Sequence, residues 1–431
     1  MNPDRWLTSR RLCAHGLLLA LALWGLYIWT IATPSLRDRN GNLKGTDFLH
    51  FYTLGSLARE HRGEDLYDTD AQASLASRLV PESEGIRYLP LYPPQFSLAF
   101  IPLTHLSYIW AFAVWGIFTT SVYGVCCYAV WRMCPRLRNF AVTTALLCFA
   151  YPAFFHLIAW GQTSALALAC FTGAFFLLRS QQELAAGLVL GCVLFKPQLG
   201  MALVAVFLAT KSWKTIAGIA ISAAAQLAAG MAYYGWGPFR AWLRILANVP
   251  TLMPAFEPRP YHTHCLRTFW AMLFPWNEVS FALYAISAGV ILVWAVLIWK
   301  SREPLSLRYA ALLLATVLVS LHLTVYDLVI LVPAMLLLVD WILSQTSPSN
   351  GMGMLVYLVC VLPLVGPFTR WIHVQLSVVA MVALLYLMWR MPIKFRRLAK
   401  AARSGAPAAL TAEDKQVRTS NPTLALTEQE G

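Results

Sequence analysis

Residues 280–299 read SFALYAISAGVILVWAVLIW, and Lys300, Arg302 and Arg308 follow directly. This run carries no charged residue, and at 1.5 Å of rise per residue it is long enough to cross a hydrocarbon core of about 30 Å. Lys and Arg collect in cytoplasmic loops, so the basic residues mark the cytoplasmic end. The stretch predicts a membrane-spanning helix, and the same pattern recurs along the chain.

The composition extends this prediction to the whole chain. Of 431 residues, 58% are hydrophobic and 12% are charged, against about 25% charged in a soluble domain. A soluble fold of this length cannot cover so much apolar surface, whereas a bilayer can. The formal net charge of +13 has its explanation in basic cytoplasmic loops, and we therefore do not expect nucleic acid as a partner.

Eleven further apolar runs give an all-α polytopic membrane protein of about twelve transmembrane helices. They are residues 12–31, 106–131, 141–159, 164–178, 184–195, 198–210, 215–234, 308–322, 328–344, 353–368 and 374–390. The first run resembles a signal peptide, but no small-x-small cleavage site follows it, so we interpret it as the first helix. Residues 184–195 and 198–210 are too short to span independently, and they meet at Lys196-Pro197.

Charge asymmetry orients the chain in a bacterial inner membrane. Arg5, Arg10 and Arg11 precede the first run, which predicts a cytoplasmic N-terminus and two long extracytoplasmic loops, residues 33–92 and 235–279. Residues 1–403 then form one membrane domain. The polar tail 404–431 is predicted to be cytoplasmic and disordered.

The spacing of the cysteines indicates neither a disulfide framework nor a zinc site. Nearly all of the nine cysteines lie in or beside apolar runs, with no CxxC and no zinc spacing. They are typical of small packing residues. We expect no disulfide framework and no cofactor, and the sequence does not indicate a divalent metal.

The first external loop contains the motif Gly45-Thr46-Asp47. Apolar residues follow at three- and four-residue spacing, which predicts a helix lying in the membrane interface: Phe48, Phe51, Tyr52, Gly55 and Ala58. Asp47 stands at the start of this helix. Its carboxylate can cap the helix or act as a catalytic acid or base, and the sequence leaves both interpretations open.

Further polar residues are predicted on the same external face. Asp65 and Asp68 lie in the first loop, which ends at a rigid Tyr92-Pro93-Pro94 corner. The aromatic residues of this corner are also typical of an interfacial belt. Gln162 follows Gly161 in a turn between two predicted helices, where it can face lipid headgroups or a ligand.

Lys196 lies between two apolar runs. A lysine at mid-bilayer costs about 2.5–3.5 kcal/mol on insertion scales, which usually indicates an anionic partner. A lipid phosphate qualifies, and the adjacent Pro197 predicts a broken helix that lines a cavity. The alternative is that the side chain snorkels to the membrane surface.

The segment Ser320–Asp327 interrupts another apolar stretch. His322 and Tyr326 are one turn apart if the helix continues, and His322 and Asp327 can form a buried pair. The second loop adds basic residues that suit a phosphate or an acidic acceptor, or that are simply solvated: Arg259, His262, His264 and Arg267.

These motifs, in this order, resemble glycosyltransferase family 87 of the membrane-embedded GT-C superfamily. The matching features are Gly45-Thr46-Asp47, Asp65-Leu66-Tyr67-Asp68, Tyr92-Pro93-Pro94, Gly161-Gln162, Lys196-Pro197 and His322 with Tyr326-Asp327. The second loop departs from the pattern, because His262-Thr263-His264-Cys265 stands where a polar Asn/Gln/Ser cluster is expected.

The resemblance implies a transferase that uses a polyprenyl-phosphate sugar, with mannose as the first candidate. The acceptor is a glycan or lipid on the extracytoplasmic side. It also implies that Asp47 is the general base and that Lys196, His322, Arg267 and Gln162 bind the donor phosphate. Tyr92, Asp65, Asp68, Tyr326 and Asp327 support them. A polytopic transporter or lipid flippase is the alternative, although such proteins usually show an internal repeat.

Overall fold

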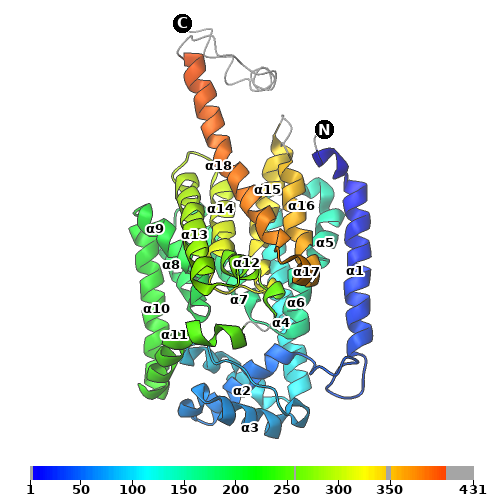
Figure 1. The fold of residues 1–431 in the computed structure, drawn as a ribbon, viewed down its shortest axis with the longest axis vertical. Helices are drawn as coiled ribbons and strands as arrows, with labels where there is room; N and C mark the ends of the chain where they lie inside the picture. Colours follow the sequence, from blue (N-terminus) through cyan, green and yellow to red (C-terminus); the bar gives the residue numbers. More distant parts are fainter. Residues whose placement is uncertain (1–2, 257–258, 346–350, 404–431) are drawn as a thin grey trace.

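The computed structural model describes residues 3–256, 259–345 and 351–403, and this part of the chain contains helices but no strands. Two isolated antiparallel bridges occur, between Arg37 and Leu43 and between Thr263 and Thr324. Helix α1 begins and α18 ends at the same end of the molecule, whereas α2 and α3 lie at the opposite end (Figure 1).

Six segments of the described chain are long and apolar enough to cross a membrane. They are α1 (Ser9–Ile31), α4 (Tyr108–Arg132), α10 (Trp213–Tyr234), α13 (Asn277–Trp299), η9 with α15 (Val325–Ser344), and α16 with η10 and α17 (Met352–Ile372). A seventh arises if Leu137–Phe149, which contains α5, and α6 (Pro152–Trp160), bent by 44°, form one span. The fold is therefore helical and rich in membrane-spanning segments.

The remaining predicted spans are shorter apolar helices. They are α7 (Ser164–Arg179), α8 (Glu183–Gly191) with η6 (Cys192–Phe195), η7 (Pro197–Leu199) with α9 (Met201–Ala209), α14 (Leu305–Val319) and the start of α18 (Leu376–Arg403). The predicted number of twelve spanning helices is not confirmed. Breaks at Gly161, Lys196 and Ser320 end several helices before they cover the thickness of a bilayer.

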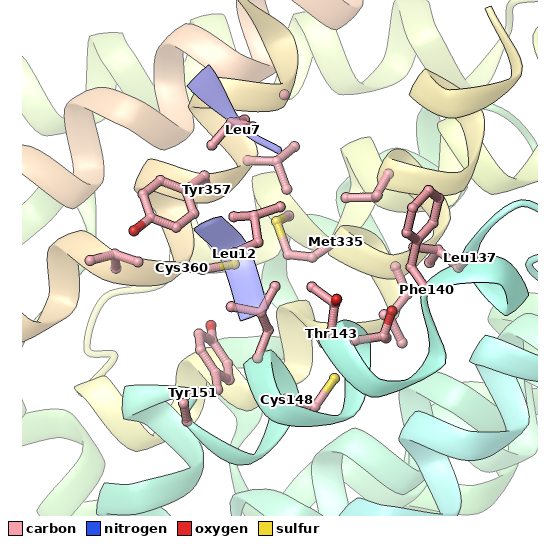
Figure 2. A pocket seen from close by; sticks show the side chains of 18 of the residues that line it. Leu7, Leu12, Leu137, Phe140, Thr143, Cys148, Tyr151, Met335, Tyr357 and Cys360 are labelled. Atoms are coloured by element: carbon pink, nitrogen blue, oxygen red, sulfur yellow. The ribbon is translucent and has the colours of Figure 1, made fainter. Parts of the chain in front are cut away.

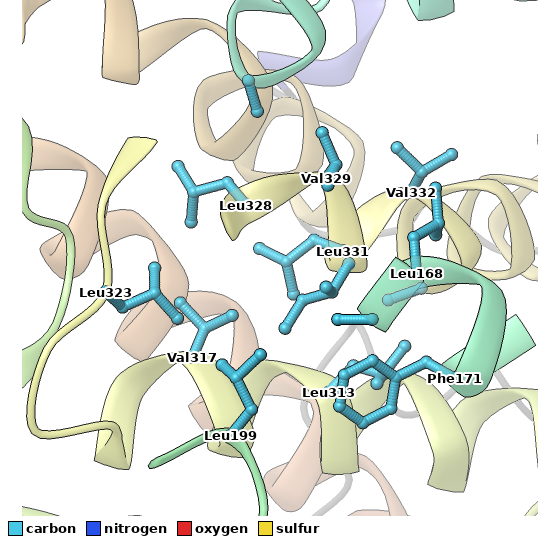
Figure 3. Close-up of a cluster of buried hydrophobic side chains, with 14 of the residues drawn as sticks. Leu168, Phe171, Leu199, Leu313, Val317, Leu323, Leu328, Val329, Leu331 and Val332 are labelled. Carbon is cyan, nitrogen blue, oxygen red and sulfur yellow. The ribbon is translucent and has the colours of Figure 1, made fainter. Parts of the chain in front are cut away.

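Helix α14 forms the centre of the bundle. Every residue from Tyr309 to Val319 is buried, as expected of a helix that is apolar on all sides. Figure 3 shows Leu313 and Val317 among side chains from α7 and η9 such as Phe171 and Leu328. This core holds together α7, the hairpin of α8 and α9 with Lys196 at its break, and η9, and these elements supply part of the candidate site.

The first predicted external loop forms short helices, and α2 and α3 lie at the end opposite the termini (Figure 1). These helices are α2 (Thr46–Arg59), η2 (Gly63–Tyr67) and α3 (Thr69–Leu79), and η4 (Pro94–His105) follows the loop. The second predicted loop contains α11 (Gly237–Phe256) and α12 (Leu266–Leu273). The sequence predicts a helix with one apolar face at α2, but the structure buries every residue from Phe48 to Ala58. Element η4 packs on α2 so closely that a Cβ at Gly55 would lie 2.8 Å from Phe100 Cβ.

Candidate functional site

Lys196 occupies a break between two short helices. Its backbone is extended (φ −128°, ψ 71°), and Pro197 starts the next element, so no α-helix can continue through it. The side chain is 5% exposed, which rules out snorkelling. Its Nζ donates to Asp327 Oδ1 at 2.6 Å and to Ser164 Oγ at 2.9 Å. The anionic partner of Lys196 in this structure is therefore Asp327.

Asp327 is held by the turn that precedes it. Residues 320–324 are not helical, and Thr324 is the N-cap of η9 (Val325–Leu331). The backbone N–H and the hydroxyl group of Thr324 both donate to Asp327 Oδ2 at 3.2 Å. Ser164 Oγ donates to Asp327 Oδ1 at 2.5 Å. Asp327 is 2% exposed, so three separate segments satisfy one buried carboxylate. The sequence suggested His322 as a buried partner of Asp327, whereas the structure gives Asp327 an ion pair with Lys196 and places His322, half-buried, in the turn before η9.

Asp47 lies in the first turn of α2, where Gly45 adopts a left-handed conformation (φ 68°) as the N-cap. Hydroxyl groups of Tyr108 and Tyr88 fix this turn, since Tyr108 donates to Gly45 O at 2.8 Å and Tyr88 donates to Thr46 O. The carboxylate of Asp47 accepts a hydrogen bond from Gln162 Nε2 at 2.7 Å. This contact favours a role in the site over a role as helix cap.

The environment of Asp47 makes its carboxyl group unusually basic. Burial raises the pKa of Asp47 to about 6, although the hydrogen bond from Gln162 and the charge of Lys196 act to lower it. The side chain nevertheless keeps partial exposure. A half-accessible carboxylate with a pKa near 6 can accept a proton from a bound hydroxyl group at neutral pH.

Gly161 sets the position of Gln162. It ends α6 with φ 72°, and a Cβ there would lie 2.6 Å from Phe48 Cβ. Trp115 Nε1 donates to the Gly161 carbonyl at 3.0 Å. The turn can therefore rest directly on α2 only because residue 161 has no side chain, and this contact brings Gln162 to Asp47.

Two tyrosines belong to the surroundings of the charged groups. Burial raises the pKa of Tyr92; the charges of Asp327 and Asp47 act in the same direction, and the charge of Lys196 acts to lower it. The ring of Tyr326 lies 5.0 Å from Lys196 Nζ, an arrangement that favours the cation.

The second long loop runs along the break before η9. Thr263 and Thr324 form an antiparallel bridge, and the His264 N–H donates to Leu323 O at 2.8 Å. Arg267 Nε donates to Leu321 O. The structure thus places Arg267 beside the segment that contains His322, and one guanidinium N–H is bonded to the backbone of that segment.

His262 belongs to the same loop. Its ring is edge-to-face with Trp160 at 5.6 Å, and Trp160 meets Tyr326 at 5.5 Å. Burial lowers the pKa of His262 to about 4, so its imidazole is neutral near pH 7. A neutral, half-buried ring can form hydrogen bonds with a sugar but supplies no positive charge.

Asp65 and Asp68 have local structural contacts. Asp65 forms an ion pair with Arg62 at 2.7 Å. Asp68 caps α3 by accepting from the backbone N–H groups of Asp70 and Ala71 at 2.9 and 3.0 Å. Both carboxylates were predicted to support the site, but none of their described contacts is with Asp47 or Gln162.

Sequence reasoning missed Ser164, which binds both Lys196 and Asp327. Its only local signal is its position directly after Gln162-Thr163 at the start of α7. Among residues 3–256, 259–345 and 351–403, no group of three His, Cys, Asp or Glu side chains lies close enough together to bind a metal ion.

Comparison with known protein families matches residues 91–324 to glycosyltransferase family 87, which is more than half of the chain. Comparison with curated proteins and with solved structures returned no match. The matched region contains Tyr92, Gln162, Lys196, Arg267 and His322, whereas Asp47 precedes it and Asp327 follows it. The helical membrane architecture and this match together show that the protein belongs to glycosyltransferase family 87 and is a membrane glycosyltransferase.

Proposed function

We propose that the protein transfers a hexose, with mannose as the first candidate, from a polyprenyl-phosphate donor to an acceptor hydroxyl. The acceptor is a glycan or a lipid on the extracytoplasmic side of a bacterial inner membrane. The observation that carries this proposal is that one turn binds both charged groups: Gln162 donates to Asp47, and Ser164, two residues later, contacts the buried Lys196–Asp327 pair. A proton acceptor beside a fixed cation suits transfer from a donor with a phosphate leaving group.

Asp47 acts as the general base. The acceptor oxygen attacks the anomeric carbon while the bond from that carbon to the phosphate oxygen breaks, and the hydroxyl proton passes to Asp47. Direct displacement inverts the anomeric centre. Gln162 holds the carboxylate in place through its 2.7 Å hydrogen bond, and general-base catalysis of this kind contributes about 10²–10⁴-fold in rate.

Lys196 supplies positive charge to the departing phosphate. Two of its three N–H donors are directed to Ser164 and Asp327, and the third can reach a phosphate oxygen. Asp327 fixes the ammonium group, so little reorganisation is needed when charge develops on the leaving group. His322 and Arg267 lie along the adjoining segment and act with Lys196, and no resident cofactor is required.

The decisive experiment uses the purified protein in lipid nanodiscs with a panel of polyprenyl-phosphate hexoses and with lipid and glycan acceptors. Release of polyprenyl phosphate and formation of the glycosylated acceptor are measured together, with and without a chelator of divalent metals. We expect Asp47→Asn to lower turnover by about 10²–10⁴-fold. Turnover of this variant within a few-fold of wild type, at equal folded yield, would remove Asp47 as the base.

Asp70→Asn is the matched control, because Asp70 is an exposed carboxylate whose side chain is 79% accessible and pairs with Arg87. We expect its turnover to equal that of wild type. The same assay in sealed vesicles separates the transferase from a transporter or lipid flippase. A transporter or flippase would move the donor across the membrane with its sugar–phosphate bond intact.

A further inference from the structure

A cavity of about 330 Å³ lies far from Asp47, between α1, α5, α15 and α16 (Figures 1 and 2). Its lining is almost entirely apolar, and Leu12, Phe140 and Met335 border it. These helices surround it at the end of the molecule that carries the termini, opposite α2. The cavity is therefore separate from the proposed transferase site.

Four hydroxyl groups that border this cavity already have partners within the protein. Ser9 Oγ and Thr143 Oγ1 are 3.1 Å apart, and the hydroxyl groups of Tyr123 and Tyr151 donate to the Cys148 and Leu328 carbonyls at 2.8 and 3.0 Å. The interior thus offers little to water. Apolar cavities stay dry and take apolar guests, and the cost of leaving one empty rises with its volume.

The edge of the cavity nearest the N-terminus, which Asp4, Leu7 and Tyr357 line and which is called the mouth below, adjoins polar and aromatic side chains. Between α1 and α16 the His15 Nδ1 and Tyr357 hydroxyl form a 2.9 Å hydrogen bond. The 45% exposed Trp6 packs beside both rings, with the guanidinium of Arg11 above it at 5.5 Å from the ring centroid. Trp, Tyr and Arg are the side chains that typically contact lipid headgroups.

The charge at the mouth is mainly positive. Arg5, Arg10 and Arg11 are exposed on η1 (Pro3–Trp6) and the first turn of α1. The carboxylate of Asp4 in η1 accepts hydrogen bonds from the backbone N–H groups of Gly351 and Met354 at 3.2 and 2.8 Å, so its negative charge faces the start of α16. Clustered arginines at a membrane surface attract anionic lipids.

We propose that this cavity binds one hydrocarbon chain of an anionic phospholipid whose phosphate group contacts Arg10 and Arg11. Helix α1 faces membrane lipid on its outer side, because it is a membrane-spanning segment whose outward side chains Leu17, Leu18 and Leu21 are 48–64% exposed. A lipid chain is therefore the apolar molecule with direct access to the mouth. The volume falls within the range of about 300–1,000 Å³ that is typical of ligand sites.

The test uses full-length protein in nanodiscs that contain phosphatidylglycerol with a photoreactive group on its acyl chain. After illumination, cross-linked peptides are mapped by mass spectrometry. We expect cross-links at the lining residues Met335 and Cys360 in the wild type. Leu12→Trp fills the cavity and should abolish them, whereas Leu18→Trp, which adds the same side chain to the lipid-facing side of α1, should not.

Headgroup preference gives a second measurement. We expect Arg10→Gln and Arg11→Gln each to weaken competition by unlabelled phosphatidylglycerol by about fivefold, with equal melting temperatures showing an intact fold. Cross-links that are no more frequent at Met335 than at lipid-facing residues would overturn the proposal. So would competition by phosphatidylcholine or polyprenyl phosphate that equals competition by phosphatidylglycerol.

Discussion

Lys196 and Asp327 are 131 residues apart in the chain, and their charged atoms meet at 2.6 Å inside the bundle. Ser164 bridges the pair. The contact therefore connects two interruptions of helical structure: the one at Lys196, between α8 and α9, and the one before η9. Both breaks expose backbone that must be satisfied within the protein, and a buried ion pair with additional hydrogen bonds stabilises them in one arrangement.

Lys196→Met should destabilise the fold. Removing one member of a buried pair leaves the Asp327 charge without its counter-ion, at a cost of about 3–5 kcal/mol. Lys196→Met/Asp327→Leu should recover most of this loss, because apolar side chains replace both charges, yet it should remain inactive. Thermal unfolding in detergent measures the difference.

The matched control for this prediction is Lys300→Met, which removes an exposed lysine at the end of α13. It should leave the melting temperature nearly unchanged. If Lys196→Met unfolded at the same temperature as Lys300→Met, the ion pair would contribute nothing to stability.

The pH dependence of turnover should follow the pKa of Asp47, which burial raises to about 6. The base is active only when it is ionised, so kcat/KM should be level above pH 6 and fall about tenfold per unit below it. Gln162→Ala removes a hydrogen bond that lowers this pKa, so the acidic limb should move to higher pH. A limb that stays at the same pH in this variant would show that Gln162 does not contact the ionised base.

Gly161→Ala should impair both stability and turnover. The residue has φ 72° and no room for a Cβ beside Phe48, and a non-glycine residue in such a conformation costs about 1–3 kcal/mol before any clash. Gly116→Ala in α4 is the control, because nothing lies within 4 Å of the added Cβ. Unfolding temperature and polyprenyl phosphate release are measured for both variants, and equal values for the two would contradict the packing argument.

The membrane orientation can be tested with single cysteines in a cysteine-free background. Positions near Asp65 and Arg259 should react with an impermeant maleimide from outside intact cells, and positions near Arg136, Lys211 and Arg302 only after the membrane is opened. The reason is the excess of Lys and Arg in cytoplasmic loops. Labelling of both groups from one side would overturn the orientation and, with it, the extracytoplasmic location of the site.

Local sequence was sufficient for several features. Apolar runs located the helices, because hydrophobicity and helix length depend on neighbouring residues alone. Pro197 and the polar segment Ser320–Asp327 located the two breaks for the same reason. The helix at residues 46–59 was also predictable, as was the order of Asp47, Gln162 and Lys196 along the chain.

Other features depended on packing between distant segments. The sequence predicted an anionic partner for Lys196, and the structure shows that Asp327 is one, a contact that only tertiary packing could reveal. The same limit applies to α2, whose burial comes from η4, and to Asp65 and Asp68, which form local contacts. The predicted number of twelve spans is not confirmed, because several of the apolar runs form helices shorter than a bilayer is thick, and hydrophobicity does not report where a buried helix stops.

Sequence alone therefore determined that the chain is a helical membrane protein and where its polar residues interrupt the helices. The tertiary structure decided which of those residues meet. A charge placed among apolar residues must find a partner, since an unpaired charge in a low-dielectric interior is costly. Which partner it finds depends on how helices more than a hundred residues apart pack around α14, and no local pattern encodes that.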